Sequence, residues 1–570
     1  MRKRLPRHAA CTASLLLLAA CGGSGGEIVS VGPPQLSAAV GAPLTSCTDL
    51  ASRISFASTT ITGANAIAAG TLMVAGQPVP AHCQVTGRMF DRTGIDGKAY
   101  AIGFEIRLPN DWNGRFFYQA NGGIDGSVVT ATGAVNGGGG LTNALKMGFA
   151  VISSDAGHAG SLGPFFGIDP QARLDYGYQA VGKLTPMAKS VINTAYGKGP
   201  DRSYIGGCSN GGRHTMVAAA RYADQYDGFL VGDPGFRLPL AAIANIKGAQ
   251  TYNSLATTPG NLGTGFTQAE RALVSQAVLA KCDALDGVAD GLVQDGKACQ
   301  AAFNLDRDVP TCAGARDGTC LSAAQKTSIA QLFAGATTST GTKIYSSFPW
   351  DAGLDTNGWA AWKFSNSLNL DSGAVGIIWQ VPPEDPATFN GPNFTLTGNV
   401  DTMLAKVNAT NATYTESAMS FMTPPNASNL NTLKNRGAKM MVYHGTADPI
   451  FSSDDTQNWY EQLGTQSGGS ASNFARYYRI AGMNHCAGGP ATDQFDMLTP
   501  LVNWVEKGVA PDSVRANARG PGNAGGVNAD VPSSWTADRS RPLCPYPQVV
   551  KYKGTGSVES ADNFSCVNPT

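Results

Sequence analysis

A pentapeptide, Gly207-Cys208-Ser209-Asn210-Gly211, constrains the fold of this chain more than any other feature. It has the pattern G-x-S-x-G, and it stands between a short apolar run, Tyr204-Ile205, and a segment with helical character from Gly212 to Tyr222. Between a strand and a helix, this pattern is typical of a nucleophile elbow, a strained turn that holds the serine hydroxyl exposed above a sheet. The alternative is an incidental turn, because the chain contains 70 glycines.

The histidine that would serve Ser209 follows from chain order and setting. In hydrolases built on such an elbow, an acid and then a histidine follow the serine along the chain. Only His444 and His485 lie usefully downstream. His444 belongs to the apolar run 439–445, which predicts a buried strand, whereas His485 lies in the glycine-rich stretch 482–489, which predicts a loop. A general base needs a partly solvated loop position, so we expect His485 to fill this role.

The acid of the expected triad belongs on the loop after a late strand. Asp448 stands directly after the predicted strand 439–445 and would hold the imidazole of His485 in the correct tautomer. A solvated turn aspartate before Pro449 is the other interpretation of Asp448. Asp454 and Asp455 remain alternatives for the acid.

Twelve cysteines give an independent argument. Cys11 and Cys21 fall within a predicted export signal, and the remaining ten predict five disulfides in an exported chain. Cys208 and Cys486 each adjoin one of the two candidate catalytic residues, the serine and the histidine. If those two residues come within hydrogen-bond reach, the adjoining cysteines are close enough to be bonded. A zinc site is disfavoured, because no C-x-x-C pair or spaced histidine pair accompanies them.

The N-terminus predicts export. Basic residues precede a short apolar run that ends at Ala20, so residues 1–20 are expected to be a signal peptide. The run ends in Leu18-Ala19-Ala20-Cys21, which resembles a bacterial lipobox, and residues 21–45 would form a tether. We therefore expect a lipoprotein on the outer membrane or in the periplasm, attached to membrane only through a lipid on Cys21. The alternative is an ordinary secretory signal cleaved near the same alanines, which gives a secreted protein.

The order of predicted elements indicates an α/β fold. Apolar runs at 101–108, 115–118, 149–154 and 226–232 predict strands that alternate with helices, as in a mainly parallel sheet. At about residue 238 the pattern changes to helices mixed with loops rich in Asn, Thr and Gly. A chain of 570 residues exceeds one ordinary core, so we expect a core built from residues 46–237 and 433–570, with residues 238–432 inserted between them.

The charge balance excludes one class of partner. The formal net charge is zero, and no basic stripe appears after the first residues, so binding to nucleic acid is not expected. Charged residues make up 14% of the chain, against roughly a quarter in ordinary globular domains. This composition favours a loop-rich exported protein.

Several features of the sequence together resemble a known family. The elbow at residues 206–213, the cysteine beside each of Ser209 and His485, and the tail Arg541-Pro542-Leu543-Cys544-Pro545-Tyr546-Pro547 are similar to the tannase and feruloyl esterase family. The likeness covers most of the chain beyond about residue 45. It implies an α/β-hydrolase core, an inserted lid over residues 238–432, a calcium ion in that lid, and cleavage of aromatic carboxylic esters.

Two backbone amides would form an oxyanion hole. One belongs to the residue after the nucleophile, Asn210, and the other to a glycine turn that follows an early strand. The family's motif assigns the second amide to Gly123. This chain departs from the motif at Ala120 and Asn121, so Gly122 stays possible. A plain β-turn is the alternative for this segment.

An acidic loop lies inside the predicted lid. Three carboxylates within eight residues suit a hard cation, although the spacing is not that of an EF-hand. The resemblance implies a Ca²⁺ ion bound by Asp283, Asp286 and Asp290 together with the backbone carbonyls of Val288 and Leu292. An acidic turn without a bound ion is the alternative.

The last expectations concern disulfide pairs among the remaining cysteines and the role of three tryptophans in the predicted lid. The cysteines would form local pairs, Cys282–Cys299 around the acidic loop, Cys312–Cys320, Cys47–Cys83 and Cys544–Cys566. Three tryptophans, Trp359, Trp362 and Trp379, are candidates for an aromatic substrate slot, and lid core is the equally favoured alternative.

Together these features predict a calcium-containing serine esterase that acts on a small aromatic ester of hydroxycinnamate or gallate type. The stretch 362–379 contains no arginine and only one cation, Lys363, so a terephthalate monoester is the less favoured substrate. A surface lipoprotein that binds a ligand without turnover is the alternative from another class. A peptidase or general lipase is disfavoured by the family likeness.

Overall fold

A computed structural model describes residues 34–134 and 137–569. The predicted signal peptide, Cys11, the lipobox Cys21 and the first part of the predicted tether lie outside the described residues. Within them, no helix is long and apolar enough to cross a bilayer.

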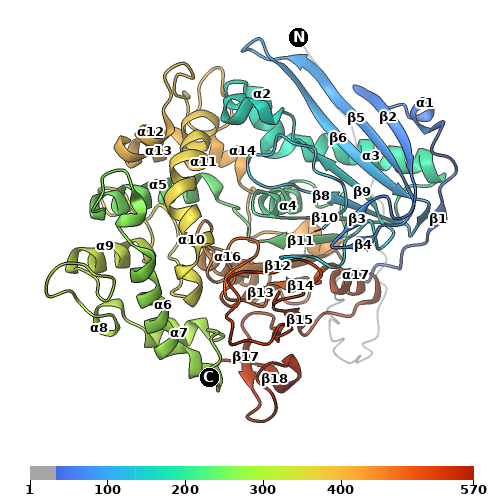
Figure 1. Cartoon of the computed structure of the whole chain (residues 1–570). Coiled ribbons are helices and arrows are strands. Elements are labelled where there is room, and N and C mark those ends of the chain that lie inside the picture. The colour runs from blue at the N-terminus through green and yellow to red at the C-terminus, as the bar shows by residue number, and fades with distance from the viewer. Residues whose placement is uncertain (1–33, 135–136, 570) are drawn as a thin grey trace, which may run out of the picture.

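A mixed sheet forms the centre of the molecule (Figure 1). It has nine strands in the order β13-β12-β11-β10-β8-β9-β6-β5-β2. The six strands from β13 to β9 are parallel, and β6, β5 and β2 continue the sheet antiparallel. The strands are β2 (Thr59–Ile67), β5 (His82–Thr93), β6 (Ala99–Pro109), β8 (Arg115–Gln119), β9 (Ala150–Ser154), β10 (Arg202–Cys208), β11 (Gly228–Gly232), β12 (Lys439–Gly445) and β13 (Ala475–Ile480).

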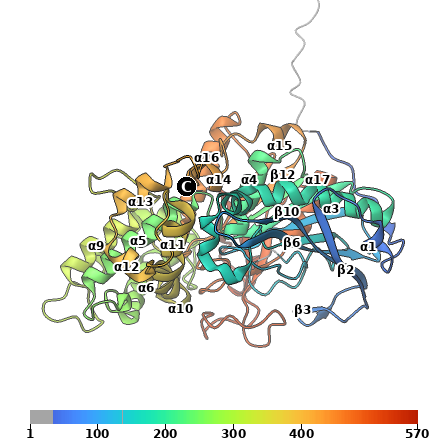
Figure 2. The same cartoon turned by 90° about the horizontal axis from the view of Figure 1, so that it is seen from above.

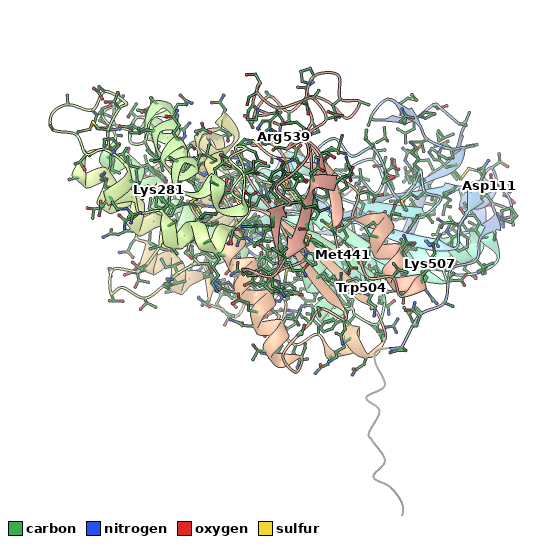
Figure 3. The ribbon with its side chains drawn as sticks, turned by 90° about the horizontal axis from the view of Figure 1, so that it is seen from below. Asp111, Lys281, Met441, Trp504, Lys507 and Arg539 are labelled. Carbon is green, nitrogen blue, oxygen red and sulfur yellow. A yellow bond between two sulfur atoms is a disulfide. The ribbon has the colours of Figure 1, made fainter. Side chains whose placement is uncertain are left out.

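Helices cover both faces of this sheet. Residues of α3 (Ala180–Tyr196), α4 (Asn210–Arg221) and α16 (Ser453–Gln466) share one apolar cluster, and α17 (Leu498–Lys507) contributes to a second. The strand β12 alternates between them, because Met440 belongs to the first cluster and Met441 to the second. In Figure 3, Met441 of β12 and Trp504 of α17 mark this second cluster. Both faces of the parallel strands are therefore buried, which explains their nearly continuous apolar sequences.

A group of helices lies between β11 and β12 in the sequence. In Figures 1 and 2 most of these helices stand beside the sheet, but the last of them packs on it, because its Leu433 belongs to the first apolar cluster. They have an apolar core of their own that includes Tyr252, Phe266 and Trp359. Thr267 and Glu270 form a capping box that starts α6. The helices are α5 (Leu238–Leu255), α6 (Gln268–Cys282), α7 (Gly296–Ala302), α8 (Leu305–Asp308), α9 (Ala323–Phe333), α10 (Asn357–Ala360), α11 (Ser367–Gly373), α12 (Gly391–Thr397), α13 (Val400–Val407), α14 (Ala418–Met422) and α15 (Asn431–Asn435).

Short elements complete the described chain. They are α1 (Leu50–Arg53), α2 (Pro170–Leu174), β1 (Ala42–Pro43), β3 (Met73–Val74), β4 (Gln77–Pro78), β7 (Asp111–Trp112), β14 (Gln494–Phe495), β15 (Val514–Asn517), β16 (Ser540–Leu543), β17 (Val549–Tyr552) and β18 (Phe564–Val567). A mainly parallel sheet, with helices on both faces and a helical insertion before its last two strands, is an α/β-hydrolase core. The predicted fold class is confirmed.

The predicted tether extends too far. Residues 35–45 pack on the core, because Gln35 Nε2 donates to the carbonyl of Val505 (2.8 Å) and the amide of Ala39 donates to Glu506 (2.9 Å). The strand β1 of this segment pairs with β7. Backbone groups that bond the core in this way belong to the folded unit, so the sequence prediction that residues 35–45 form a tether is wrong.

Five disulfides connect the described chain, and all five predicted pairings are confirmed. The longest in sequence joins Cys208 to Cys486, which are 278 positions apart. The others are local: Cys47–Cys83, Cys282–Cys299, Cys312–Cys320 and Cys544–Cys566. Several disulfides in one chain are typical of proteins exported to an oxidising compartment.

Candidate active site

The turn between β10 and α4 has the strand–turn–helix setting that the pentapeptide predicts. Ser209 adopts φ 66° and ψ −127° there, a conformation that strains any residue with a side chain. The flanking glycines are required by close packing, because a Cβ added to Gly207 or to Gly211 would lie 2.3 Å from the carbonyl oxygen of Ala120. The sequence pattern is therefore the steric condition for holding Ser209 in this turn.

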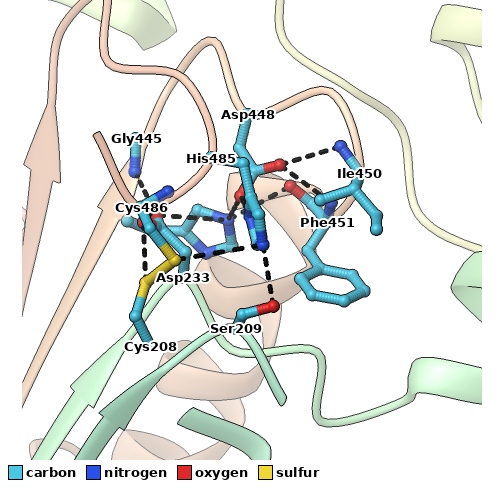
Figure 4. Close-up of a disulfide and its surroundings, with 10 residues drawn as sticks. Cys208, Ser209, Asp233, Gly445, Asp448, Ile450, Phe451, His485 and Cys486 are labelled. Carbon is cyan, nitrogen blue, oxygen red and sulfur yellow. Dashed lines mark hydrogen bonds and ion pairs between the residues drawn. A yellow bond between two sulfur atoms is a disulfide. The ribbon is translucent and has the colours of Figure 1, made fainter. Parts of the chain in front are cut away.

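The structure brings Ser209, His485 and Asp448 into one hydrogen-bonded chain (Figure 4). Nε2 of His485 lies 2.8 Å from Oγ of Ser209, and Nδ1 lies 2.7 Å from Oδ2 of Asp448. This arrangement fits a hydroxyl that donates to Nε2 while Nδ1–H donates to the carboxylate. In that tautomer the imidazole can accept the serine proton.

The Asp448 carboxylate is fixed by its own loop and by a second histidine. Its Oδ1 accepts hydrogen bonds from the amides of Ile450 (2.8 Å) and Phe451 (3.0 Å). Nε2 of the fully buried His444 lies 3.3 Å from Oδ2. Burial raises the pKa of Asp448, but the imidazoles of His485 and His444 lower it more, so the net pKa lies below its ordinary value. Asp448 is therefore held as an anion beside His485.

The other candidate acids make different contacts. Asp455 forms an ion pair with Arg237, and Asp454 accepts a hydrogen bond from Oγ of Ser347 at 2.8 Å. Of the three aspartates considered in the sequence, Asp448 is the one in contact with His485.

A buried aspartate that the sequence analysis missed holds the catalytic loops together. Asp233 follows β11 directly, and its carboxylate accepts from the amides of Gly445 (2.7 Å) and Cys486 (2.8 Å). Burial raises the pKa of Asp233 to about 6, although His444 lowers it. The position at the carboxyl end of a parallel strand could have signalled a role at this edge. Asp233 and the Cys208–Cys486 disulfide thus fix the histidine loop against the elbow from the same side (Figure 4).

The residue after Ser209 is anchored through its side chain. Nδ2 of Asn210 donates to Oδ2 of Asp125 (2.8 Å), and Oδ1 accepts from Nε of Arg213 (2.6 Å). Nε2 of His214 lies 2.9 Å from the same oxygen of Asp125. Burial raises the pKa of Asp125 to about 7, and the nearby imidazole of His158 opposes this rise. This network joins the elbow to the loop that contains Gly123.

Ser209 lies on a partly open cavity whose empty volume, with the solvent at its mouth included, is about 390 Å³. Gly123 and Asn210, the two residues expected to donate the oxyanion amides, line it together with Ser209. Gly123 has φ 64°, which favours glycine, and the alternative Gly122 lies with its Cβ position 3.8 Å from Cβ of Ser209. Most of the wall is apolar and comes from both the core and the insertion: Leu238, Ala242, Leu370, Ala374, Ile450 and Phe451.

The three candidate tryptophans take different places. Trp362 and Trp379 line the Ser209 cavity, and the ring of Trp362 stands edge-on to the imidazole of His485 at 4.9 Å. Trp359 does not join them. It is 3% exposed, packs in the apolar core of the insertion, and lines a separate cavity together with Lys363.

The acidic loop after α6 contains carboxylate oxygens without protein partners. Asp283 accepts from the amides of Asp290 and Gly291, and Asp290 forms an ion pair with Arg541. Oδ2 of Asp286 and Oδ1 of Asp290 are buried and have no hydrogen-bond partner. Unpaired buried carboxylate oxygens favour a bound cation, and the flanking carbonyls of Val288 and Leu292 add oxygen donors of the type that Ca²⁺ prefers.

The convergence of ligand atoms is weaker in this loop than around Asp233. Among the described residues, two groups of three acidic, cysteine or histidine side chains have ligand atoms within 4.8 Å of one another, Cys208 with Asp233 and Cys486, and Asp233 with His444 and Asp448. Both belong to the catalytic edge described above, where hydrogen bonds and a disulfide already engage these atoms.

Comparisons with known proteins agree with this architecture. Residues 83–567 match the family described as tannase and feruloyl esterase. The chain is 40% identical over 531 residues to mono(2-hydroxyethyl) terephthalate hydrolase of Piscinibacter sakaiensis, covering 86% of this chain and 85% of that protein. It is 26% identical over 494 residues to the probable feruloyl esterase B-1 of Aspergillus fumigatus, covering 81% and 82%.

Two solved structures share the fold. Feruloyl esterase B from Aspergillus oryzae superposes with a TM-score of 0.72 at 22% identity, over 91% of this chain and 99% of that one. Tannin acyl hydrolase from Aspergillus niger gives 0.68 at 19% identity, over 92% and 95%. The protein is a carboxylic ester hydrolase, and the chain belongs to the tannase and feruloyl esterase family.

Proposed function

We propose that the protein is a serine esterase that hydrolyses esters of aromatic acids, of the hydroxycinnamate or gallate type, through an acyl-enzyme. The observation that carries this proposal is the hydrogen-bonded chain of Ser209, His485 and Asp448, which lies on a largely apolar cavity with two tryptophans in its wall. A planar aromatic acyl group fits such a wall by shape and by apolar contact.

In the proposed reaction, Oγ of Ser209 attacks the ester carbonyl while its proton passes to Nε2 of His485. Asp448 stabilises the imidazolium that forms. The bond between the carbonyl carbon and the alkoxy oxygen then breaks, and Nε2 returns the proton to the leaving alcohol. Water activated by His485 cleaves the acyl-enzyme and releases the acid.

The amides of Asn210 and Gly123 would donate to the oxygen that becomes negative in each tetrahedral intermediate. Removing one such donor costs about 10²- to 10³-fold in rate in other acyl-transfer enzymes. The bond from Asn210 to Asp125 supports this role, because it fixes the residue whose amide must point into the cavity.

The charge of the cavity favours neutral or phenolic acyl groups. No lysine or arginine of the described residues lines the Ser209 cavity, and Lys363 lies on the separate cavity beside Trp359. A second carboxylate, as in a terephthalate monoester, would need a cation there, and losing such a charged pair costs about 2 kcal/mol, a factor of some tens in catalytic efficiency. Hydrolysis of a terephthalate monoester is the alternative, favoured by the relative of that name.

A calcium ion in the acidic loop is part of the proposal. Asp283, Asp286 and Asp290, with the carbonyls of Val288 and Leu292, would hold it and neutralise the unpaired carboxylate oxygens. The ion would stabilise the insertion, and no catalytic step depends on it. We also propose export as a lipoprotein acylated on Cys21; the five disulfides support export, and the lipobox supports the acylation.

Turnover of a substrate panel tests the function. We expect hydrolysis of p-nitrophenyl acetate, and higher kcat/KM for methyl ferulate and methyl gallate than for mono(2-hydroxyethyl) terephthalate. If the terephthalate monoester is the best substrate, then another residue supplies the missing cation and the proposed acyl group is wrong. Binding of these esters without release of product would point to the non-catalytic alternative.

A further inference from the structure

One wall of the Ser209 cavity contains a buried acid that the proposed reaction does not use. Asp371 lies on α11, is 4% exposed, and lines the cavity together with Ser209 and Trp379. Its Oδ2 is buried and has no hydrogen-bond partner. The carboxyl group receives one hydrogen bond from Asn245, and the charge of Lys363 lies nearby.

A donor without a partner stands in the same wall. Nε1 of Trp379 is buried, has no hydrogen-bond acceptor, and belongs to a side chain that lines the same cavity. An unmet buried donor or acceptor costs about 1–3 kcal/mol, so these two atoms, each on a side chain that lines the cavity, favour a ligand that engages them. A hydroxyl group can do both, since it donates one hydrogen bond and accepts others.

We infer that Asp371 is the specificity-determining residue of this cavity, and that it binds a phenolic hydroxyl of the acyl group with the indole N–H of Trp379 as the second partner. The inference rests on the proposed function and narrows it to esters whose aromatic ring carries a hydroxyl. The ester carbonyl then lies at Ser209, and the hydroxylated edge of the ring lies at the wall formed by α11.

The titration of Asp371 also favours a hydroxyl on the substrate over a carboxylate. Burial raises its pKa to about 8, while the hydrogen bond from Asn245 and the charge of Lys363 lower it. A hydroxyl finds a partner in either protonation state, because the carboxylate accepts and the carboxylic acid both donates and accepts. A carboxylate on the substrate meets repulsion from the ionised form and no cation in the wall.

Two esters that differ only in the hydroxyl test this inference. Methyl p-coumarate and methyl cinnamate have the same carbon skeleton, and the wild-type kcat/KM should be at least about tenfold higher for the hydroxylated ester. In Asp371→Leu this ratio should fall to near one while hydrolysis of methyl cinnamate persists. Asp371→Asn, whose amide both donates and accepts hydrogen bonds, should retain part of the preference.

Ser372→Ala is the matched control. Ser372 is buried on the same helix, but its Oγ donates to the carbonyl of Leu368 and it does not line the cavity. This variant should keep the wild-type ratio. A wild-type ratio near one, or an unchanged ratio in Asp371→Leu, overturns the inference. If Asp371→Leu does not fold, the wild-type ratio together with Asp371→Asn decides it. If the wild-type protein hydrolyses none of these esters, the proposed function itself is refuted.

Discussion

Removing the Cys208–Cys486 disulfide should damage both stability and catalysis. The bond closes a separation of 278 residues, and the chain-entropy relation gives about 5–6 kcal/mol at 25 °C for a loop of this length, an upper value. The bond between Cys312 and Cys320 closes only 8 residues, for which the same relation gives about 2–3 kcal/mol. The two disulfides therefore form a matched pair that differs in loop length and in distance from the catalytic residues.

The assay compares two double variants. The first carries Cys208→Ala and Cys486→Ala, and the second carries Cys312→Ala and Cys320→Ala. We expect the first to lose about 3 kcal/mol more in free energy of unfolding, measured by urea denaturation. Its kcat/KM on p-nitrophenyl acetate should fall by about ten- to a hundredfold, because a shift of about 1 Å between Ser209 and His485 is enough for that. The loss is bounded, since Asp233 still accepts from the amide of residue 486.

The second variant should keep the wild-type kcat/KM. Equal losses of stability in the two variants would refute the loop-length argument. Full activity in the first variant would show that the disulfide has no part in positioning the histidine loop.

Two further predictions concern other parts of the molecule. Chelation by EDTA should lower Tm in the wild type, since an ion held at 100 times its Kd stabilises the folded state by about 2.7 kcal/mol, and Asp286→Asn should weaken this response. A melting curve indifferent to EDTA and to added Ca²⁺, with no metal found by elemental analysis, would mean that the loop is an ordinary acidic turn. Glu506→Gln should cost about 3 kcal/mol at pH 7, because the buried carboxylate bonds Arg115 through both oxygens, whereas Asp562→Asn in an exposed pair should cost little. Burial raises the pKa of Glu506, but Arg115, the amide of Ala39 and the hydroxyl of Tyr204 together lower it more. The stabilisation by Glu506 is therefore present above its unfolded pKa and lost as pH falls through its folded pKa. A cost of Glu506→Gln that does not shrink below about pH 4 would contradict this.

Local patterns were sufficient to predict much of the site. The glycines around Ser209 are legible in sequence because the turn itself requires them. His485 and Cys486 could be predicted because chain order and the adjacent cysteines restrict the choice. The continuous apolar run of β12 indicated a buried strand because both faces of the strand pack on apolar clusters.

Contacts that depend on three-dimensional packing could not be predicted in the same way. Asp233 reaches Cys486 because β11 and β12 are neighbours in the sheet and the histidine loop folds back over their ends. The position of Asp371 depends on how α11 packs against α5. Trp359 and Trp362 are three positions apart, yet they line different cavities, because the π-helical turn Ala361–Asn366 begins between them. Neither distance in sequence nor residue type reveals such placements.

Covalent labelling of the nucleophile tests the central claim most directly. A serine-directed organophosphonate should add one equivalent of label, abolish hydrolysis of p-nitrophenyl acetate, and appear by peptide mass spectrometry on Ser209. Ser209→Ala should take up no label and should lose most of a rate factor on the order of a million. Label on another residue, or a well-folded Ser209→Ala protein that keeps more than about a tenth of the activity, would contradict the account.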